Sequence, residues 1–155
     1  MKKYDKRDHR AFARWAADCA ERVLPLFEKE YPKDSRPRAA LEACRTWVRT
    51  GVFRMAEVRK AALAAHAAAR RAPEAGAARF AARAAGQAMA AAHVPQHALA
   101  SAIYALKAIA AAGPAEAETQ TAKEREWQLR HLPRNLRGLL GSSCHAARLW
   151  RRARP

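Results

Sequence analysis

The sequence lacks most of the features that would point to a particular chemistry. It has only three cysteines in 155 residues, and their spacings of 25 and 100 are not those of a disulfide framework. There is no glycine-rich phosphate loop, no nucleophile elbow and no pair of carboxylates at a clear spacing, so the sequence does not favour an enzyme. No apolar run reaches the roughly 20 residues of a membrane span, and no apolar region of a signal peptide follows the charged start. We therefore expect a cytoplasmic protein that does not associate with membranes.

Large apolar side chains are also scarce. Aromatic residues make up 7% of the chain, whereas 42 residues are alanine. Alanine is the best helix former, and few stretches are β-branched or alternate between apolar and polar residues. The sequence therefore predicts an all-α fold with a core built by close approach of helices. The length fits a single helical domain, which we place over residues 5–140.

Apolar residues at helical spacing, together with proline and glycine, predict six to seven helices. A first helix should begin near Asp8, and Asp34-Ser35 should cap a second that Gly51 ends. The others should run from about 55 to 72, 73 to 92, 95 to 112 and 117 to 131, with a last short helix from 133. Short connections favour antiparallel helical hairpins, stacked in a bundle or a HEAT-like array. On the fourth helix, Ala82, Gly86 and Ala90 recur one turn apart and would allow a neighbouring helix to approach closely.

Acidic residues are half as common as basic ones, 14 against 30, which gives a net charge of +16. Much of the excess lies at the two ends, with +3 over residues 1–10 and +7 over residues 130–155. The arginines could reflect GC-rich codons, or they could attract nucleic acid or an acidic protein. The basic tail 141–155 has poor periodicity. We expect it to be disordered, to fold on something else, or to be foreign to the native gene.

Three histidines raise the question of a metal site, because His93 and His97 are four residues apart and His66 lies in another helix. Pro95 belongs at a helix start, so His93 and His97 cannot form a pair on one continuous helix. Straight antiparallel helices would separate the levels of His66 and His93 by about 20 Å. The sequence therefore favours structural roles for all three, and predicts neither a metal ion nor a cofactor.

Asp18 and Cys19 lie near the middle of the first helix. A catalytic cysteine needs a thiolate, and Cys19 is better explained as a core neighbour of Cys44. Asp18 could pair with Arg22 at i+4, or form a buried link between hairpins. A metal- or cysteine-dependent enzyme that uses Asp18, Cys19 and the histidines remains an alternative.

Arg36 and Arg38, at a helix start, and Arg70 are candidate anion contacts. Protein interfaces favour Arg, Tyr and Trp, which adds Tyr104 to these candidates for partner binding. The basic tail, with Trp150, is the candidate for nucleic-acid contact.

Four blocks of the chain, DHRAFARWAADCAERVLPLFE, DSRPRAALEACRTW, AALAAHAAAR and AHVPQHALASAIYALKA, resemble a family of small all-helical immunity proteins of bacterial polymorphic-toxin systems. The resemblance covers about residues 5–137. It implies a cytoplasmic protein that binds and neutralises a toxin made by the same or a sibling cell. The residues of this chain that match the family pattern are Trp15, Asp18, Cys19, His66, Arg70, His93 and His97.

The leading hypothesis is therefore a non-enzymatic protein-binding module that blocks a toxin by direct contact. A basic protein does not imitate nucleic acid, so its charge favours an acidic partner surface. Nucleic-acid binding through the basic ends is the second hypothesis. Alanine-rich faces could also serve a homodimer.

Overall fold

The computed structural model describes residues 5–141 and 145–153. Within these ranges the chain forms seven α-helices and two 3₁₀ helices and no strand, which confirms the predicted all-α fold. The elements are α1 (Lys6–Glu28), α2 (Arg36–Thr50), α3 (Met55–Arg71), α4 (Ala77–Ala90), α5 (His97–Ala112), η1 (Pro114–Glu116), α6 (Ala117–His131), η2 (Arg134–Leu139) and α7 (His145–Arg152).

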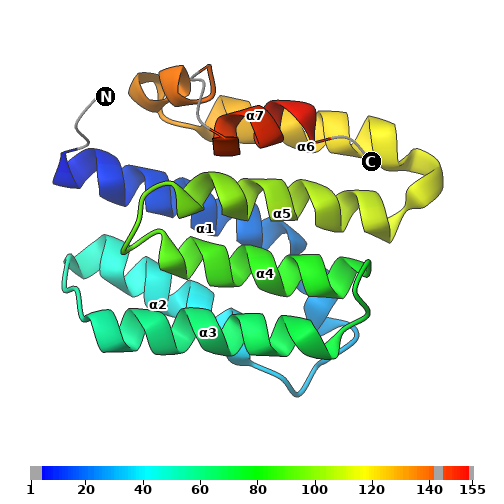
Figure 1. The fold of residues 1–155 in the computed structure, drawn as a ribbon, viewed down its shortest axis with the longest axis horizontal. Coiled ribbons are helices and arrows are strands. Elements are labelled where there is room, and N and C mark those ends of the chain that lie inside the picture. The colour runs from blue at the N-terminus through cyan, green and yellow to red at the C-terminus, as the bar shows by residue number, and fades with distance from the viewer. Residues whose placement is uncertain (1–4, 142–144, 154–155) are drawn as a thin grey trace.

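The helices form a bundle in which α4 is central. α3, α4 and α5 lie side by side in one layer, with α1 and α2 behind them and α6 and α7 beside α5 (Figure 1). α1 packs more extensively on α4 and α5 than on α2, the next helix in the chain. Of the two predicted arrangements, the structure is therefore the bundle, because α1 bridges elements that a linear stack of hairpins would keep apart.

The helix ends follow from a few residues. α1 begins at Lys6, earlier than predicted, because an Asp5 carboxylate oxygen accepts the Asp8 backbone N–H at 2.7 Å and caps the helix. Gly51 ends α2 with φ of 72°, a left-handed conformation that favours glycine, as predicted. α4 begins at Ala77 rather than at the predicted Pro73, because residues 73–76 form a turn closed by a 3.0 Å backbone hydrogen bond.

Alanine makes up most of the buried core. Of the 43 buried hydrophobic residues in the described ranges, 24 are alanine. α4 contributes the densest group, and its buried side chains apart from Met89 are no larger than a methyl group. Small side chains let the backbones approach closely, so α4 can contact four other helices. Three of the largest fully buried side chains, Phe12, Trp15 and Phe27, come from α1.

The structure describes part of the basic tail, for which disorder was one of three alternatives, and residues 142–144 and 154–155 lie outside the described residues. Residues 145–152 form α7, and its Ala147 and Trp150 are buried. The Trp150 indole N–H donates to the Gln128 side-chain oxygen at 2.8 Å. The buried side chains of Ala147 and Trp150, together with this hydrogen bond, hold the segment on the bundle.

In the described part of the chain, no single helix is long and apolar enough to cross a membrane. α5 taken together with residues 114–131 passes the same test of length and composition, but the pair is bent by 115°.

Candidate functional site

His66 of α3 fills the space that Gly86 leaves on α4. An ideal Cβ atom at position 86 would lie 2.7 Å from Cε1 and 2.9 Å from Nε2 of the His66 ring. The small residues predicted on α4 therefore make room for a side chain at this point. The His66 Nδ1 atom is buried and has no hydrogen-bond partner among the described residues. Burial lowers the pKa of His66, and the nearby charges of Arg83 and Arg70 lower it further.

His97, at the start of α5, lies on the other side of α4. Its Nδ1 atom is 2.7 Å from the Gln87 side-chain oxygen. Burial lowers the pKa of His97. His66 packs against Gly86 and His97 bonds the next residue, Gln87, so both rings lie along the same part of α4. His93 is exposed and stacks on Phe53, with ring centroids 6.3 Å apart. His66 therefore shares this part of α4 with His97, whereas the sequence argument estimated only the separation of His66 and His93.

The described residues contain no group of three or more His, Cys, Asp or Glu that could hold a metal ion. His66 and His97 instead form the polar centre of a larger surface. Positions 75–115, which include all of α4 and α5, contain no Asp or Glu. The outer side of these two helices therefore carries no negative side chain.

Aromatic rings and cations occupy this outer side. Phe80 of α4 and Tyr104 of α5 stack with ring centroids 6.3 Å apart, and the Lys107 ammonium lies 5.6 Å from the Tyr104 ring centroid. Residues of α3 at steps of three and four continue the same surface. We define the α3–α5 face by Arg59, Leu63, His66 and Arg70 of α3, Phe80, Arg83 and Gln87 of α4, and His97, Tyr104 and Lys107 of α5.

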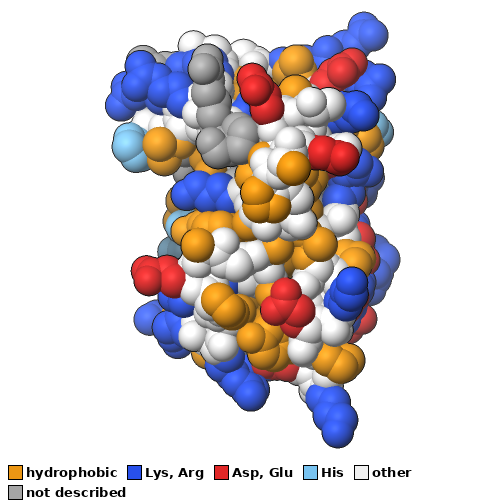
Figure 2. All heavy atoms as spheres, turned by 90° about the vertical axis from the view of Figure 1, so that its right-hand side faces the viewer, with side chains coloured by type: hydrophobic (Ala, Val, Ile, Leu, Met, Phe, Trp, Pro, Cys, Tyr) orange, Lys and Arg blue, Asp and Glu red, His pale blue; other side chains and the backbone are white. Residues whose placement is uncertain are grey.

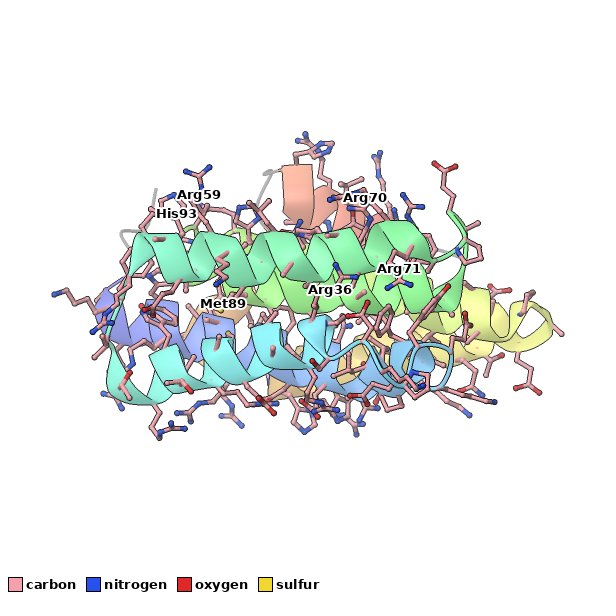
Figure 3. The ribbon with its side chains drawn as sticks, turned by 90° about the horizontal axis from the view of Figure 1, so that it is seen from below. Arg36, Arg59, Arg70, Arg71, Met89 and His93 are labelled. Carbon is pink, nitrogen blue, oxygen red and sulfur yellow. The ribbon has the colours of Figure 1, made fainter. Side chains whose placement is uncertain are left out.

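The cations of the α3–α5 face are not neutralised from within. Arg59, Arg70, Arg83 and Lys107 form none of the ion pairs found among the described residues. Arg59 and Arg70 project from α3 on the side away from α2, where His93 also lies (Figure 3). At the end of the molecule where α3 passes to α4, scattered acidic side chains lie among more abundant Lys and Arg (Figure 2). The face therefore offers positive charge to a partner.

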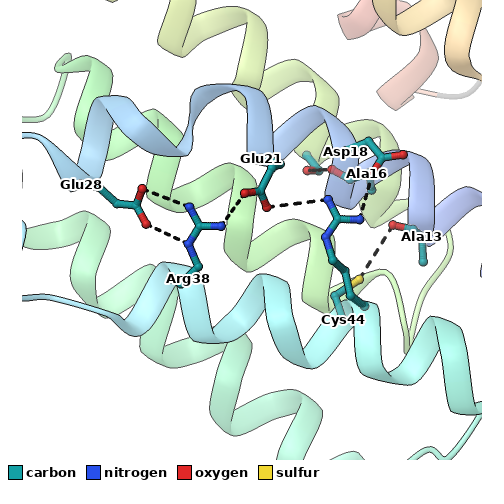
Figure 4. A network of polar contacts seen from close by, with 9 residues as sticks. Ala13, Ala16, Asp18, Glu21, Glu28, Arg38 and Cys44 are labelled. Atoms are coloured by element: carbon teal, nitrogen blue, oxygen red, sulfur yellow. Dashed lines mark hydrogen bonds and ion pairs between the residues drawn. The ribbon is translucent and has the colours of Figure 1, made fainter.

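Arg36 and Arg38, which the sequence placed with Arg70, have internal partners instead. Arg38 is held between Glu28, at 2.9 Å, and Glu21 (Figure 4). Arg36 Nη2 lies 2.7 Å from an Asp34 oxygen, and this hydrogen bond lowers the pKa of Asp34. Arg38 joins α2 to α1, and Arg36 joins α2 to the turn before it. The charge of both arginines is therefore largely neutralised by carboxylates of the same chain.

Asp18 pairs with Arg45 of α2 at 2.9 Å, not with Arg22 as the spacing suggested. Both partners are about 40% exposed, so the link is neither buried nor between hairpins. Arg22 reaches α6 instead, where its Nε atom lies 3.0 Å from each Glu124 oxygen. Its guanidinium also covers the Trp127 ring at 4.1 Å. The Glu124 side chain is only 3% exposed, and burial raises its pKa.

Gln128 of α6 is a second buried polar residue that the sequence did not single out. Its backbone oxygen accepts the Trp15 indole N–H at 2.8 Å, and its side-chain amide donates to the Ala102 carbonyl at 3.1 Å. With the Trp150 bond described above, Gln128 connects α1, α5, α6 and α7. These contacts hold α6 and α7 against the rest of the bundle.

The cysteines of the helical bundle are unsuited to nucleophilic chemistry. Cys19 and Cys44 are buried, as predicted, and neither is in a disulfide. Burial raises the pKa of Cys19 well above its usual value and that of Cys44 to about 12. Both are therefore thiols at neutral pH, whereas a nucleophile must be a thiolate. This weighs against the enzyme that uses Asp18 and Cys19.

The structure thus gathers part of the predicted site and adds to it. His66, Arg70, His97 and Tyr104 come together on one face, as separate sequence arguments could not show. Phe80, Arg83, Gln87 and Lys107 were missed. The signal that could have found them is the long stretch without acidic residues, which becomes informative once α4 and α5 are known to share an outer surface.

The helical bundle thus combines a cationic, aromatic face with buried thiols that are protonated at neutral pH. Residues 2–135 match the family described as "Imm-5 like putative immunity protein". Because the match covers most of the chain, the protein belongs to this family, as the resemblance of its sequence blocks indicated. Comparisons with curated proteins and with solved structures found no match.

Proposed function

We propose that the protein neutralises a toxin by binding it directly, and that the α3–α5 face docks on an acidic surface of that toxin. The family supports an immunity function in general. The observation that carries the choice of surface is the absence of any Asp or Glu from positions 75–115, beside cations that lack internal ion-pair partners. Blocking a toxin requires burial of its working surface, so no catalytic group is needed.

The chemistry of the face suits such docking. Unpaired arginines lose less on binding than arginines already held in ion pairs, because no internal bond has to break. The half-buried Tyr104 is stacked on Phe80 and is therefore rigid, which lowers the entropy cost of making it a contact. Positive charge also accelerates encounter with an acidic partner, more strongly at low salt.

Direct tests can use co-expression in a toxin-sensitive bacterium with candidate toxin domains from the source genome. The wild-type chain should restore growth, and Arg70→Glu should lower affinity about tenfold or more, because it replaces an attraction by a repulsion. Lys123→Glu on α6 is the matched control, since it makes the same charge change at another exposed position. Equal loss of binding in both variants would mean that only net charge matters and would refute the proposed face.

Nucleic-acid binding is the second candidate, and one hollow favours it. Lys6, Arg7 and Arg14 of α1 line a volume of about 520 Å³ next to His131. Asn135 donates to Asp8 at 2.5 Å, so the start of α1 and the segment after α6 lie together. Basic residues at the start of α1 therefore lie at the same edge as the segment that follows α6.

This alternative predicts binding of RNA or DNA that weakens steeply with salt. Arg14→Gln should reduce it, whereas Arg70→Gln should have less effect. A chain that restores growth in the toxin assay but binds no nucleic acid at physiological salt would remove this candidate.

A further inference from the structure

The connection between α2 and α3 exposes apolar side chains that a folded protein would normally bury. Val52 is 61% exposed, Phe53 42% and Met55 38%, and all three lie within four positions of one another. Elsewhere in the described ranges the exposed large apolar residues, Leu63, Leu129 and Leu149, stand singly. Grouped exposure of this kind marks contact sites.

Phe53 lines a hollow of about 520 Å³ beside this connection, which we call the turn hollow. Its apolar wall is formed by Trp47, Phe53 and Ala92. The Trp47 ring is fixed by His9, with ring centroids 5.0 Å apart, and His9 is itself held 2.6 Å from the Ala91 carbonyl oxygen. The aromatic wall is therefore in place before a partner arrives.

The rim of the turn hollow is cationic. Lys6 and Arg10 line it directly. Arg10 is fixed because its guanidinium donates to the Val48 and Arg49 carbonyls at the end of α2, and carbonyl acceptors leave its positive charge intact. Glu57, the carboxylate nearest in sequence to Phe53, is paired with Arg54 at 3.3 Å. An occupant would meet an apolar wall and positive charge together.

We propose that the turn hollow binds an acidic segment of a partner protein that carries one large apolar side chain. The apolar side chain would pack on Trp47 and Phe53, and carboxylates beside it would face Lys6 and Arg10. A second copy of this chain is a poor occupant, because each copy carries a net charge of +16 and would bring a cationic rim against another. Only the identification of the partner as a toxin rests on the proposed function.

A short peptide with one phenylalanine flanked on both sides by glutamates is the probe. Titrated into the isotope-labelled full chain, it should shift the NMR signals of the Trp47 indole and of residues 51–55. Replacing the peptide phenylalanine by alanine should weaken binding about tenfold or more, since the apolar contact with Trp47 and Phe53 is lost. Replacing the glutamates by lysines should abolish it.

Phe53→Ser should weaken binding of the phenylalanine peptide about tenfold. Leu129→Ser is the matched control, because Leu129 is 41% exposed on α6, and it should bind like the wild type. Should Phe53→Ser alter the far-UV circular dichroism, Lys6→Glu provides a second variant, because it reverses a charge on the rim and should weaken binding of the same peptide.

Three results would each overturn the inference. They are the absence of shifts around Trp47, equal affinity for the phenylalanine and alanine peptides, or shifts confined to the α3–α5 face. Growth in the toxin assay is a separate readout. Failure of Arg70→Glu to affect it would count against the proposed function without affecting the peptide result.

Discussion

The α1–α2 side of the molecule and the α3–α5 face both carry many arginines, but they use them differently. On the α1–α2 side, Arg38 and Arg45 lie between carboxylates of α1 and hold the two helices together. On the α3–α5 face, Arg59 and Arg70 belong to none of the ion pairs in the described residues. Net charge alone therefore does not identify a binding surface. The informative quantity is the charge left over after internal pairing.

The sharpest test of internal pairing compares two arginines of α1 and α2 whose ion pairs differ in burial. Arg22→Ala should lower the free energy of unfolding by about 2–3 kcal/mol, because it strands the buried Glu124 carboxylate without its partner. Arg45→Ala should cost about 0.5 kcal/mol, since both Arg45 and Asp18 reach solvent. Urea denaturation followed by circular dichroism measures both. Equal losses would show that the Arg22 pair is not buried in solution.

Gly86→Ala tests whether the centre of the α3–α5 face is packed as described. Overpacking against His66 should cost about 2 kcal/mol, and better helix propensity should return about 1 kcal/mol, for a net loss of about 1 kcal/mol. The double variant Gly86→Ala with His66→Ala should be at least as stable as His66→Ala alone. Gly138→Ala is the control, because nothing lies within 4 Å of a Cβ atom at that position. A stabilised Gly86→Ala variant would mean that the His66 ring lies elsewhere.

Arg38→Gln and Arg59→Gln separate structural charge from free charge. Arg38→Gln should lower stability by about 0.5–1 kcal/mol and leave toxin binding unchanged, because Arg38 bonds two glutamates of its own chain. Arg59→Gln should leave the thermal midpoint unchanged and weaken toxin binding. Thermal unfolding and a binding isotherm, measured on both variants, decide the matter. The opposite pattern would reverse the roles assigned to the two regions.

As the pH falls, we expect interactions in the α3–α5 face to lose their contribution to stability at a higher pH than the ion pairs of the α1–α2 side. The pKa values of His66 and His97 are lowered in the fold from a usual value of 6.5, so folding favours their neutral forms. Their contribution to stability is present above pH 6.5 and is lost as the pH falls through the lowered values. We expect this to be the smallest of the four effects, because both rings are only half-buried. In the variant His66→Gln the decline in unfolding free energy between pH 7.5 and pH 5 should be shallower, and an unchanged decline would contradict the assignment.

Sequence patterns were sufficient for most of the helices and poor for the partners of polar residues. Gly51 and the periodic apolar residues of α1 predicted elements that the structure contains, because they act within a few residues along the chain. The pairing of Asp18 was predicted wrongly, because its i+4 neighbour Arg22 found a carboxylate 102 positions away, in α6. In the tail, Trp150 of α7 bonds Gln128 of α6, 22 positions away, a contact that the local sequence pattern does not reveal.

By itself, the sequence determined that this chain is helical and positively charged, and it carried the resemblance to immunity proteins. These properties depend on composition and on contacts between near neighbours. Only the tertiary structure decided which arginines are neutralised, that His66 packs on Gly86 and shares that part of α4 with His97, and that Val52, Phe53 and Met55 remain at the surface. Ion pairing and burial depend on which distant helices pack together. The faces of alanine-rich helices are nearly alike, so the few residues that are not alanine determine this packing.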